Sequence, residues 1–102
     1  MGEFVKVAKA DELKPGQVRL VEVKGKDIAL FNLEGEFFAL DNACTHEQGS
    51  LADGEVDGDR VICPLHGAEF DIRTGEVLLP PAYDDVEIYP VRVTGGDVEV
   101  EV

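Results

Sequence analysis

The chain has 102 residues, 44% of them apolar, which suits one compact core and leaves little room for a second domain. Its 22 acidic side chains outnumber the 9 lysines and arginines, so the formal net charge is −13 at pH 7. This charge repels phosphate backbones and anionic lipid surfaces, and we expect neither nucleic acid nor a membrane as a partner. No apolar run is long enough to span a bilayer, and the first residues lack the pattern of a signal peptide. The sequence therefore predicts a soluble, cytoplasmic protein.

Short segments rich in Val, Ile and Phe alternate with clusters of Gly, Asp, Asn and Pro, a pattern typical of strands joined by turns. We expect strands at residues 4–7, 18–23, 28–33, 36–40, 60–63, 86–93 and 97–102. A single helical turn is expected at residues 10–13, because Pro15 and Gly16 end it. The last segment alternates valines with acidic residues, as a strand with one buried face does. The predicted fold class is all-β.

Residues 41–81 differ in composition from the rest of the chain. They contain every cysteine and histidine, several glycines and three of the five prolines. We expect an elaborated loop region here, placed on a β base. Loops held by a rigid scaffold are common places for functional sites, because their backbone can present ligands that a flat sheet face cannot.

The cysteines and histidines form two short pairs. Cys44 and His46 are separated by one residue, and Cys63 and His66 follow sixteen residues later with two residues between them. A hairpin-length segment between two such pairs allows two loop tips to face each other. The four side chains would then surround one inorganic centre with soft and borderline donors.

Three other interpretations of these residues are open at this point. A disulfide between Cys44 and Cys63 is disfavoured by the reducing cytosol and leaves both histidines unexplained. A structural zinc site accepts the same four donors at similar spacing. A nucleophilic cysteine paired with a histidine needs in addition an orienting group and a substrate cleft, which this short chain does not indicate.

The segments CTHEQGSL and CPLHGAEFDIRTGEV resemble the two cluster-binding boxes of the Rieske-type [2Fe-2S] ferredoxins. The resemblance extends to Gly67 after the last pair, to Phe70 and Asp71, to Thr74-Gly75 and to the prolines at positions 80 and 81. It implies a Rieske-type fold, in which an antiparallel β-sandwich base carries an inserted cluster-binding subdomain. The implied boundaries are residues 1–102 for the single domain and residues 41–81 for the subdomain.

By this resemblance, one [2Fe-2S] cluster per chain is held by four residues. Cys44 and Cys63 would bind one iron through thiolates, and His46 and His66 would bind the other through neutral imidazole nitrogens. Two ferric ions, two sulfides and two thiolates sum to zero charge, so the oxidised centre is less negative than one with four thiolates. Adding an electron is then easier, which places the potential in the Rieske range of roughly −150 to +300 mV.

Features that the chain lacks predict a potential toward the low end of that range. In the respiratory and photosynthetic Rieske proteins, two further cysteines bridge the loops, and a Ser and a Tyr donate hydrogen bonds to cluster sulfurs. The matching bridge positions are Gly49 and Leu65, and the matching donor positions are Ala68 and Phe70. Without hydroxyl donors, and with a surrounding net negative charge, the extra electron is less stabilised.

A centre whose iron positions are all filled offers no place for a substrate, so we expect an electron carrier and no enzyme. A terminal oxygenase would need a second iron with two further histidines, which this chain does not have. The resemblance implies a monomeric ferredoxin that passes single electrons from a flavin-containing, NAD(P)H-dependent reductase to a terminal oxygenase acting on an aromatic compound. Alternatives are the small Rieske subunit of an assimilatory nitrite reductase and a structural zinc-binding interaction module.

Acidic residues near the two boxes are candidates for docking of partners. Glu47, Asp84 and Asp85 lie close in sequence to the expected cluster end of the molecule. We expect them to face basic patches on partners, with an association that weakens as salt increases.

Overall fold

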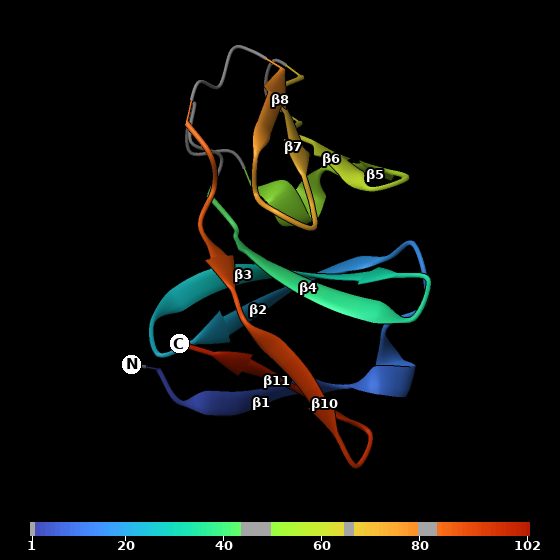
Figure 1. The fold of residues 1–102 in the computed structure, drawn as a ribbon, viewed down its shortest axis with the longest axis vertical. Coiled ribbons are helices and arrows are strands. Elements are labelled where there is room, and N and C mark those ends of the chain that lie inside the picture. The colour runs from blue at the N-terminus through green and yellow to red at the C-terminus, as the bar shows by residue number, and fades with distance from the viewer. Residues whose placement is uncertain (1, 44–49, 65–66, 80–83) are drawn as a thin grey trace.

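Three antiparallel sheets are stacked along the long axis of the molecule in the computed structural model, which describes residues 2–43, 50–64, 67–79 and 84–102 (Figure 1). The basal sheet has the order β1 (Phe4–Lys9), β11 (Asp97–Glu101), β10 (Val91–Thr94). The middle sheet has the order β2 (Val18–Val23), β3 (Lys26–Leu33), β4 (Glu36–Asp41), β9 (Ile88–Tyr89). The upper sheet has the order β5 (Glu55–Asp57), β6 (Arg60–Ile62), β7 (Glu69–Asp71), β8 (Val77–Leu79). The all-β prediction is confirmed, and the helical elements described are two short 3₁₀ turns, η1 (Ala10–Glu12) and η2 (Leu51–Asp53).

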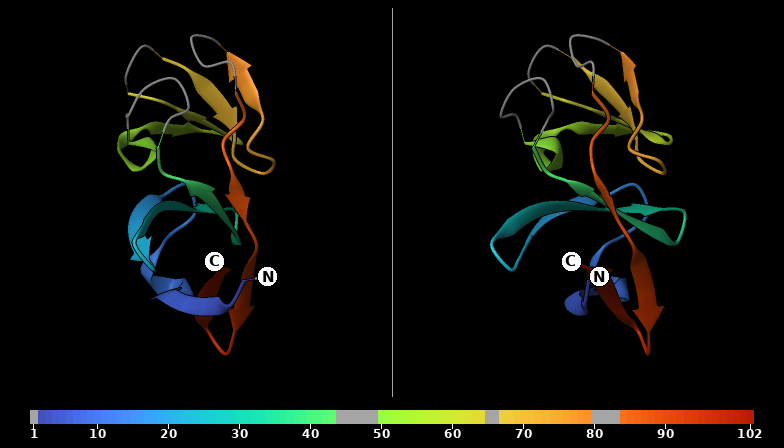
Figure 2. Two further views of the ribbon diagram at one scale, coloured as in Figure 1. Left: turned by 90° about the vertical axis from the view of Figure 1, so that its left-hand side faces the viewer. Right: turned by 60° about the vertical axis from the view of Figure 1, so that its left-hand side comes forward.

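Strand β3 is buried on both faces and separates two cores. Ala29 and Phe31 pack toward the upper sheet, whereas Ile28 and Leu30 pack toward the basal sheet. Successive residues of a strand point to opposite faces, so the continuous apolar run of β3 supplies both cores at once. Figure 2 shows the consequence, with the upper and basal sheets on opposite sides of the middle sheet.

Two-residue turns fix the hairpins of the middle sheet. Lys24 and Gly25 between β2 and β3 have φ angles of 51° and 78°, and Glu34 and Gly35 between β3 and β4 have φ angles of 54° and 94°. Positive φ at both positions is the geometry whose twist matches that of the flanking strands. These turns set the register of β3 against both neighbours.

The stretch predicted as one strand at 86–93 is two strands in different sheets. β9 pairs with β4 in the middle sheet, and β10 pairs with β11 in the basal sheet. Pro90 stands between them, and because proline has no backbone N–H it cannot continue a ladder on that side. Its carbonyl still accepts a hydrogen bond from the Glu101 N–H at 2.9 Å.

The elaborated loop region expected at 41–81 contains the four strands of the upper sheet. Each has three residues, too few for alternation to appear in the sequence. Side chains from β6 and β7, among them Val61 and Phe70, close the upper core over β3 and β4. In the ranges that the structure describes, none of the helical segments is long and apolar enough to cross a bilayer.

Candidate metal centre

The residues on either side of the first predicted ligand pair form a closed base. Ala43 and Ser50 make an isolated antiparallel bridge, and the Leu51 N–H donates to the Asn42 carbonyl at 2.8 Å. Residues 44–49, which include Cys44 and His46, lie outside the described residues. The residues that flank the first predicted ligand pair are therefore held side by side.

The second predicted pair begins at the end of β6. The backbone N–H of Cys63 donates to the Ala68 carbonyl at 2.7 Å, which closes the connection from β6 to β7. Gly67 has a φ of +72°, a conformation that glycine adopts without strain. His66 lies outside the described residues, together with Leu65.

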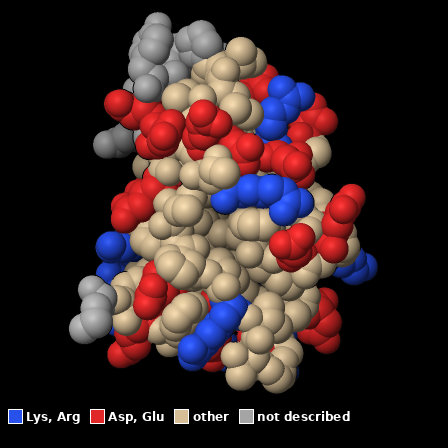
Figure 3. Space-filling model, in the orientation of Figure 1, with Lys and Arg blue, Asp and Glu red and all other residues tan. Residues whose placement is uncertain are grey.

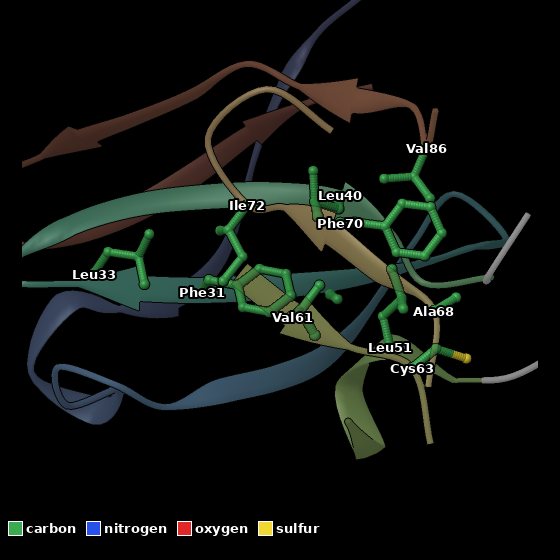
Figure 4. Close-up of a cluster of buried hydrophobic side chains, with 11 residues drawn as sticks. Phe31, Leu33, Leu40, Leu51, Val61, Cys63, Ala68, Phe70, Ile72 and Val86 are labelled. Carbon is green, nitrogen blue, oxygen red and sulfur yellow. The ribbon is translucent and has the colours of Figure 1, made fainter. Parts of the chain in front are cut away.

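The bases of both loops share one buried patch. Leu51, Cys63 and Ala68 are each no more than 1% exposed and belong to the same core cluster. Figure 4 shows the three side chains at one end of that cluster, with the Cys63 sulfur directed away from Leu51 and from the ring of Phe70. The backbone thus brings the two motif loops to neighbouring starting points, with the Cys63 thiol at the edge of the packed side chains.

The ligand set itself remains a prediction. The described ranges include only one of the four predicted ligands, Cys63, and leave out Cys44, His46 and His66. Within those ranges, no three His, Cys, Asp or Glu side chains are grouped so that they could hold a metal. The donor chemistry and the position of Cys63 fit an iron–sulfur centre, because a thiol at the edge of a dry core is shielded from water on one side. Ala68 and Phe70, the positions that lack hydroxyl donors, are fully buried.

Several further residues of the second motif form a tight turn between β7 and β8. The Asp71 Oδ1 accepts from the backbone N–H groups of Arg73 at 2.7 Å and Thr74 at 3.2 Å, and the Gly75 N–H donates to the Asp71 carbonyl at 2.8 Å. The Val86 N–H in turn donates to the Gly75 carbonyl at 2.9 Å. This turn therefore supports the chain where it returns from residues 80–83, which lie outside the described residues and include Pro80 and Pro81.

The acids predicted to dock partners have different outcomes. Glu47 lies outside the described residues. The Asp85 carboxylate accepts a hydrogen bond from the Val77 N–H at 2.9 Å, so it has a structural contact in addition to its charge.

The upper sheet and its connections are rich in acidic residues. Figure 3 shows them over the upper part of one face. Among the described residues from 50 to 85, the acidic ones are Asp53, Glu55, Asp57, Asp59, Glu69, Asp71, Glu76, Asp84 and Asp85, and the basic ones are Arg60 and Arg73. The end of the molecule that carries both motifs therefore has a negative potential.

Asn42, which the sequence does not single out, lies at the base of the first motif loop. It is buried, and its side chain bonds to Ser50 and Ala52, on the far side of the first motif loop. The sequence places it directly after a predicted strand, where an asparagine ordinarily indicates a turn. Its burial depends on residues eight and ten positions away, which no local pattern reveals.

Comparison with known proteins identifies the family. The profile of the Rieske [2Fe-2S] domain matches residues 3–90. The chain belongs to the Rieske [2Fe-2S] family. It is 42% identical over 99 residues to the biphenyl dioxygenase ferredoxin subunit of Pseudomonas sp. strain KKS102, covering 96% of this chain and 91% of that protein.

Solved structures give the same assignment of this Rieske chain. A chain in the complex of reduced oxygenase and oxidised ferredoxin in carbazole 1,9a-dioxygenase superposes with a TM-score of 0.92 and 33% identity, covering 96% of this chain and 92% of that one. A Mycobacterium tuberculosis protein assigned as the small subunit of an NADH-dependent nitrite reductase gives a TM-score of 0.90 and 26% identity, covering 100% and 96%. The predicted Rieske-type fold and its single [2Fe-2S] cofactor are confirmed. The chain is an electron carrier and not itself an enzyme.

Proposed function

We propose that this Rieske ferredoxin, as a cytoplasmic monomer, passes single electrons from a flavin-containing NAD(P)H reductase to the terminal oxygenase of a ring-hydroxylating dioxygenase. The observation that carries this proposal is the likeness over nearly the whole chain to the ferredoxin subunit of a biphenyl dioxygenase. The likeness to the ferredoxin chain in an oxygenase complex adds support.

Cys44 and Cys63 hold one iron through thiolates in this proposal, and His46 and His66 hold the other through imidazole nitrogens. A [2Fe-2S] group, when bound, supplies reversible one-electron oxidation and reduction. Residues 41–81 form the cluster-binding subdomain of a single domain. Leu51 and Ala68 exclude water from the inner side of Cys63, which lowers the local dielectric and lets nearby dipoles act more strongly.

The negative charge around the upper sheet steers partners in this proposal. Opposite charges on two proteins raise their association rate, and salt screens the attraction over about 10 Å at 0.1 M. The chain with its −13 charge would therefore associate with a basic surface on the reductase and on the oxygenase in turn.

The direct test is electron transfer to purified partners. The reduced chain is mixed in a stopped-flow instrument with the terminal oxygenase of a biphenyl dioxygenase system, and its re-oxidation is followed by visible absorbance. We expect rapid re-oxidation whose second-order rate falls as salt is increased. Absence of electron transfer would contradict the oxygenase as the partner. A transfer rate that does not depend on salt would contradict electrostatic steering.

A second candidate function is supported by the likeness to the nitrite reductase subunit. A sirohaem nitrite reductase, offered in the same experiment, tests it. Transfer to that enzyme and not to the oxygenase would replace the first proposal with the second. Neighbouring genes that encode a ring-hydroxylating oxygenase or a sirohaem reductase give an independent indication.

A further inference from the structure

Two asparagines, Asn32 and Asn42, are the buried polar residues among those that the structure describes, at 3% and 8% exposure. A buried amide is costly unless its donors and acceptors find partners. Both asparagines have such partners, but at different places along the chain. This pair allows a comparison between a buried asparagine beside the cluster loops and one remote from them.

Asn42 joins the two ends of the first motif loop. Its Nδ2 donates to the Ser50 Oγ at 2.9 Å, and its Oδ1 accepts from the Ala52 N–H at 2.8 Å. Its carbonyl accepts from the Leu51 N–H at 2.8 Å, and its own N–H donates to the Asp27 carbonyl at 3.0 Å. One residue therefore connects the end of β4 to the start of β3 and to residues 50–52.

Leu51 connects the base of the first motif loop to the base of the second through the core. It is fully buried and packs in the core cluster that contains Cys63 and Ala68. The contacts of Asn42 thus hold residues 42 and 50–52, which flank residues 44–49, together, and Leu51 among them shares a buried core cluster with Cys63.

We propose that Asn42 is a positioning residue for the iron–sulfur centre. It holds the base of residues 44–49 so that Cys44 and His46 are presented to the same centre as Cys63. This inference rests on the ligand set given under the proposed function. Removing the side chain leaves the base with the Ala43–Ser50 bridge and the backbone hydrogen bonds alone.

Asn32 supplies a matched control. Its Nδ2 donates to the Leu13 carbonyl at 2.7 Å, and its Oδ1 accepts from the Gly35 N–H at 2.8 Å. It stands five residues along β3 from Asp27, a separation of about 16 Å at the rise of an extended strand. Truncating Asn32 therefore removes a comparable pair of buried hydrogen bonds without changing the contacts at the base of the first motif loop.

The experiment compares the cluster-loaded wild type with Asn42→Ala, Asn32→Ala and Asn42→Asp. Cluster loss is followed by bleaching of visible absorbance in the presence of an iron chelator, and the reduced proteins are examined by electron paramagnetic resonance. We expect Asn42→Ala to lose its cluster about tenfold faster than wild type, as is typical when a residue supporting metal ligands is removed, and to give a broadened signal. Asn32→Ala should lower the urea midpoint similarly but keep the wild-type signal and a loss rate within about twofold of wild type.

The Asn42→Asp variant tests the contacts themselves. A carboxylate still accepts from the Ala52 N–H and accepts a hydrogen bond from the Ser50 hydroxyl, so the loss rate and line shape should return close to wild type. If Asn42→Ala does not fold, Ser50→Ala removes one contact only, and we expect an intermediate rate of loss.

Equal rates of cluster loss in Asn42→Ala and Asn32→Ala would overturn the inference and leave Asn42 as an ordinary core residue. If Ser50→Ala is used because Asn42→Ala does not fold, a rate of cluster loss equal to that of wild type would also overturn the inference. A wild-type protein without a Rieske-type signal would instead contradict the proposed ligand set, so the two failures are distinguishable.

Discussion

The carboxylate of Asp85 accepts a hydrogen bond from the backbone N–H of Val77 at 2.9 Å. Val77 is the first residue of β8, and Asp85 follows the connection that leaves the end of β8. The contact ties the two sides of this connection together. Beside it, the Val86 N–H donates to the Gly75 carbonyl, so the successive residues Asp85 and Val86 are attached to the start of β8 and to the turn before it.

Variants of Asp85 separate this contact from the docking charge. Asp85→Asn removes the negative charge but keeps an oxygen acceptor for the Val77 N–H, whereas Asp85→Ala removes both. If the contact dominates, Asp85→Asn keeps the wild-type rate of cluster loss to a chelator and Asp85→Ala loses the cluster faster. If the main role of Asp85 is its negative charge in docking, both variants show the same reduced salt dependence of electron transfer to the oxygenase. A wild-type result in every assay for Asp85→Ala contradicts both roles.

Gly75→Ala tests the packing of the chain against the β7–β8 turn. A Cβ at position 75 would lie 2.4 Å from the Val86 carbonyl oxygen, and the φ of +77° is itself strained for alanine. We expect destabilisation of at least about 2 kcal/mol, measured by urea unfolding. Gly16→Ala is the control, because Gly16 has a φ of +85° with open space around it and should cost about 1 kcal/mol. Equal effects of the two variants would show that the contact with Val86 is unimportant.

The midpoint potential of the wild type should lie toward the low end of the roughly −150 to +300 mV Rieske range. Ala68 and Phe70 are buried, apolar and without hydroxyl groups, at the positions that the resemblance matches to the Ser and Tyr donors of the respiratory and photosynthetic Rieske proteins. Ala68→Ser should therefore raise the potential by stabilising the added electron. Ala29→Ser, at a buried position of β3 in the same core cluster, is the control and should leave the potential unchanged. A wild-type midpoint well above zero refutes this account of the potential.

Stability should fall at alkaline pH because of Tyr89. Burial raises the pKa of its phenol above the usual 10.0, and the negative charges of Asp41 and Glu87 raise it further. The folded chain then keeps a proton that the unfolded chain has released, so the free energy of unfolding decreases as pH rises past about 10. Tyr89→Phe should lack this part of the decrease, as measured by urea unfolding at several alkaline pH values. Identical pH profiles for the two proteins would contradict the assignment.

The sequence predicted the longer strands because their signals are local. Lys24-Gly25 and Glu34-Gly35 mark two-residue turns, and the apolar run of β3 between them is long enough to be recognised. Of the upper-sheet strands, only β6 was predicted, as part of the stretch at residues 60–63, because three residues are too few to show periodicity. Pro90 divides two strands where the apolar pattern alone indicates one.

The chemistry of the site was more predictable than its support. Residue types and spacing single out the two cysteines and two histidines as candidate ligands, and the resemblance to the Rieske ferredoxins implies that they bind iron; the ligand set stays a prediction. The role of Asn42 depends on Ser50 and Ala52, and the contact of Asp85 depends on Val77. Such non-local hydrogen bonds leave no pattern in the sequence, so the structure was needed to find them.

The most direct test of the central claim is electron paramagnetic resonance of the dithionite-reduced protein carrying isotope-labelled histidine. The account predicts a coloured protein whose reduced form gives a Rieske-type signal, with an average g value below that of clusters held by four thiolates. It also predicts magnetic coupling to labelled nitrogens from two histidines, which can only be His46 and His66 because the chain has no others. A colourless protein with one zinc per chain, or a cluster signal without histidine coupling, would contradict it.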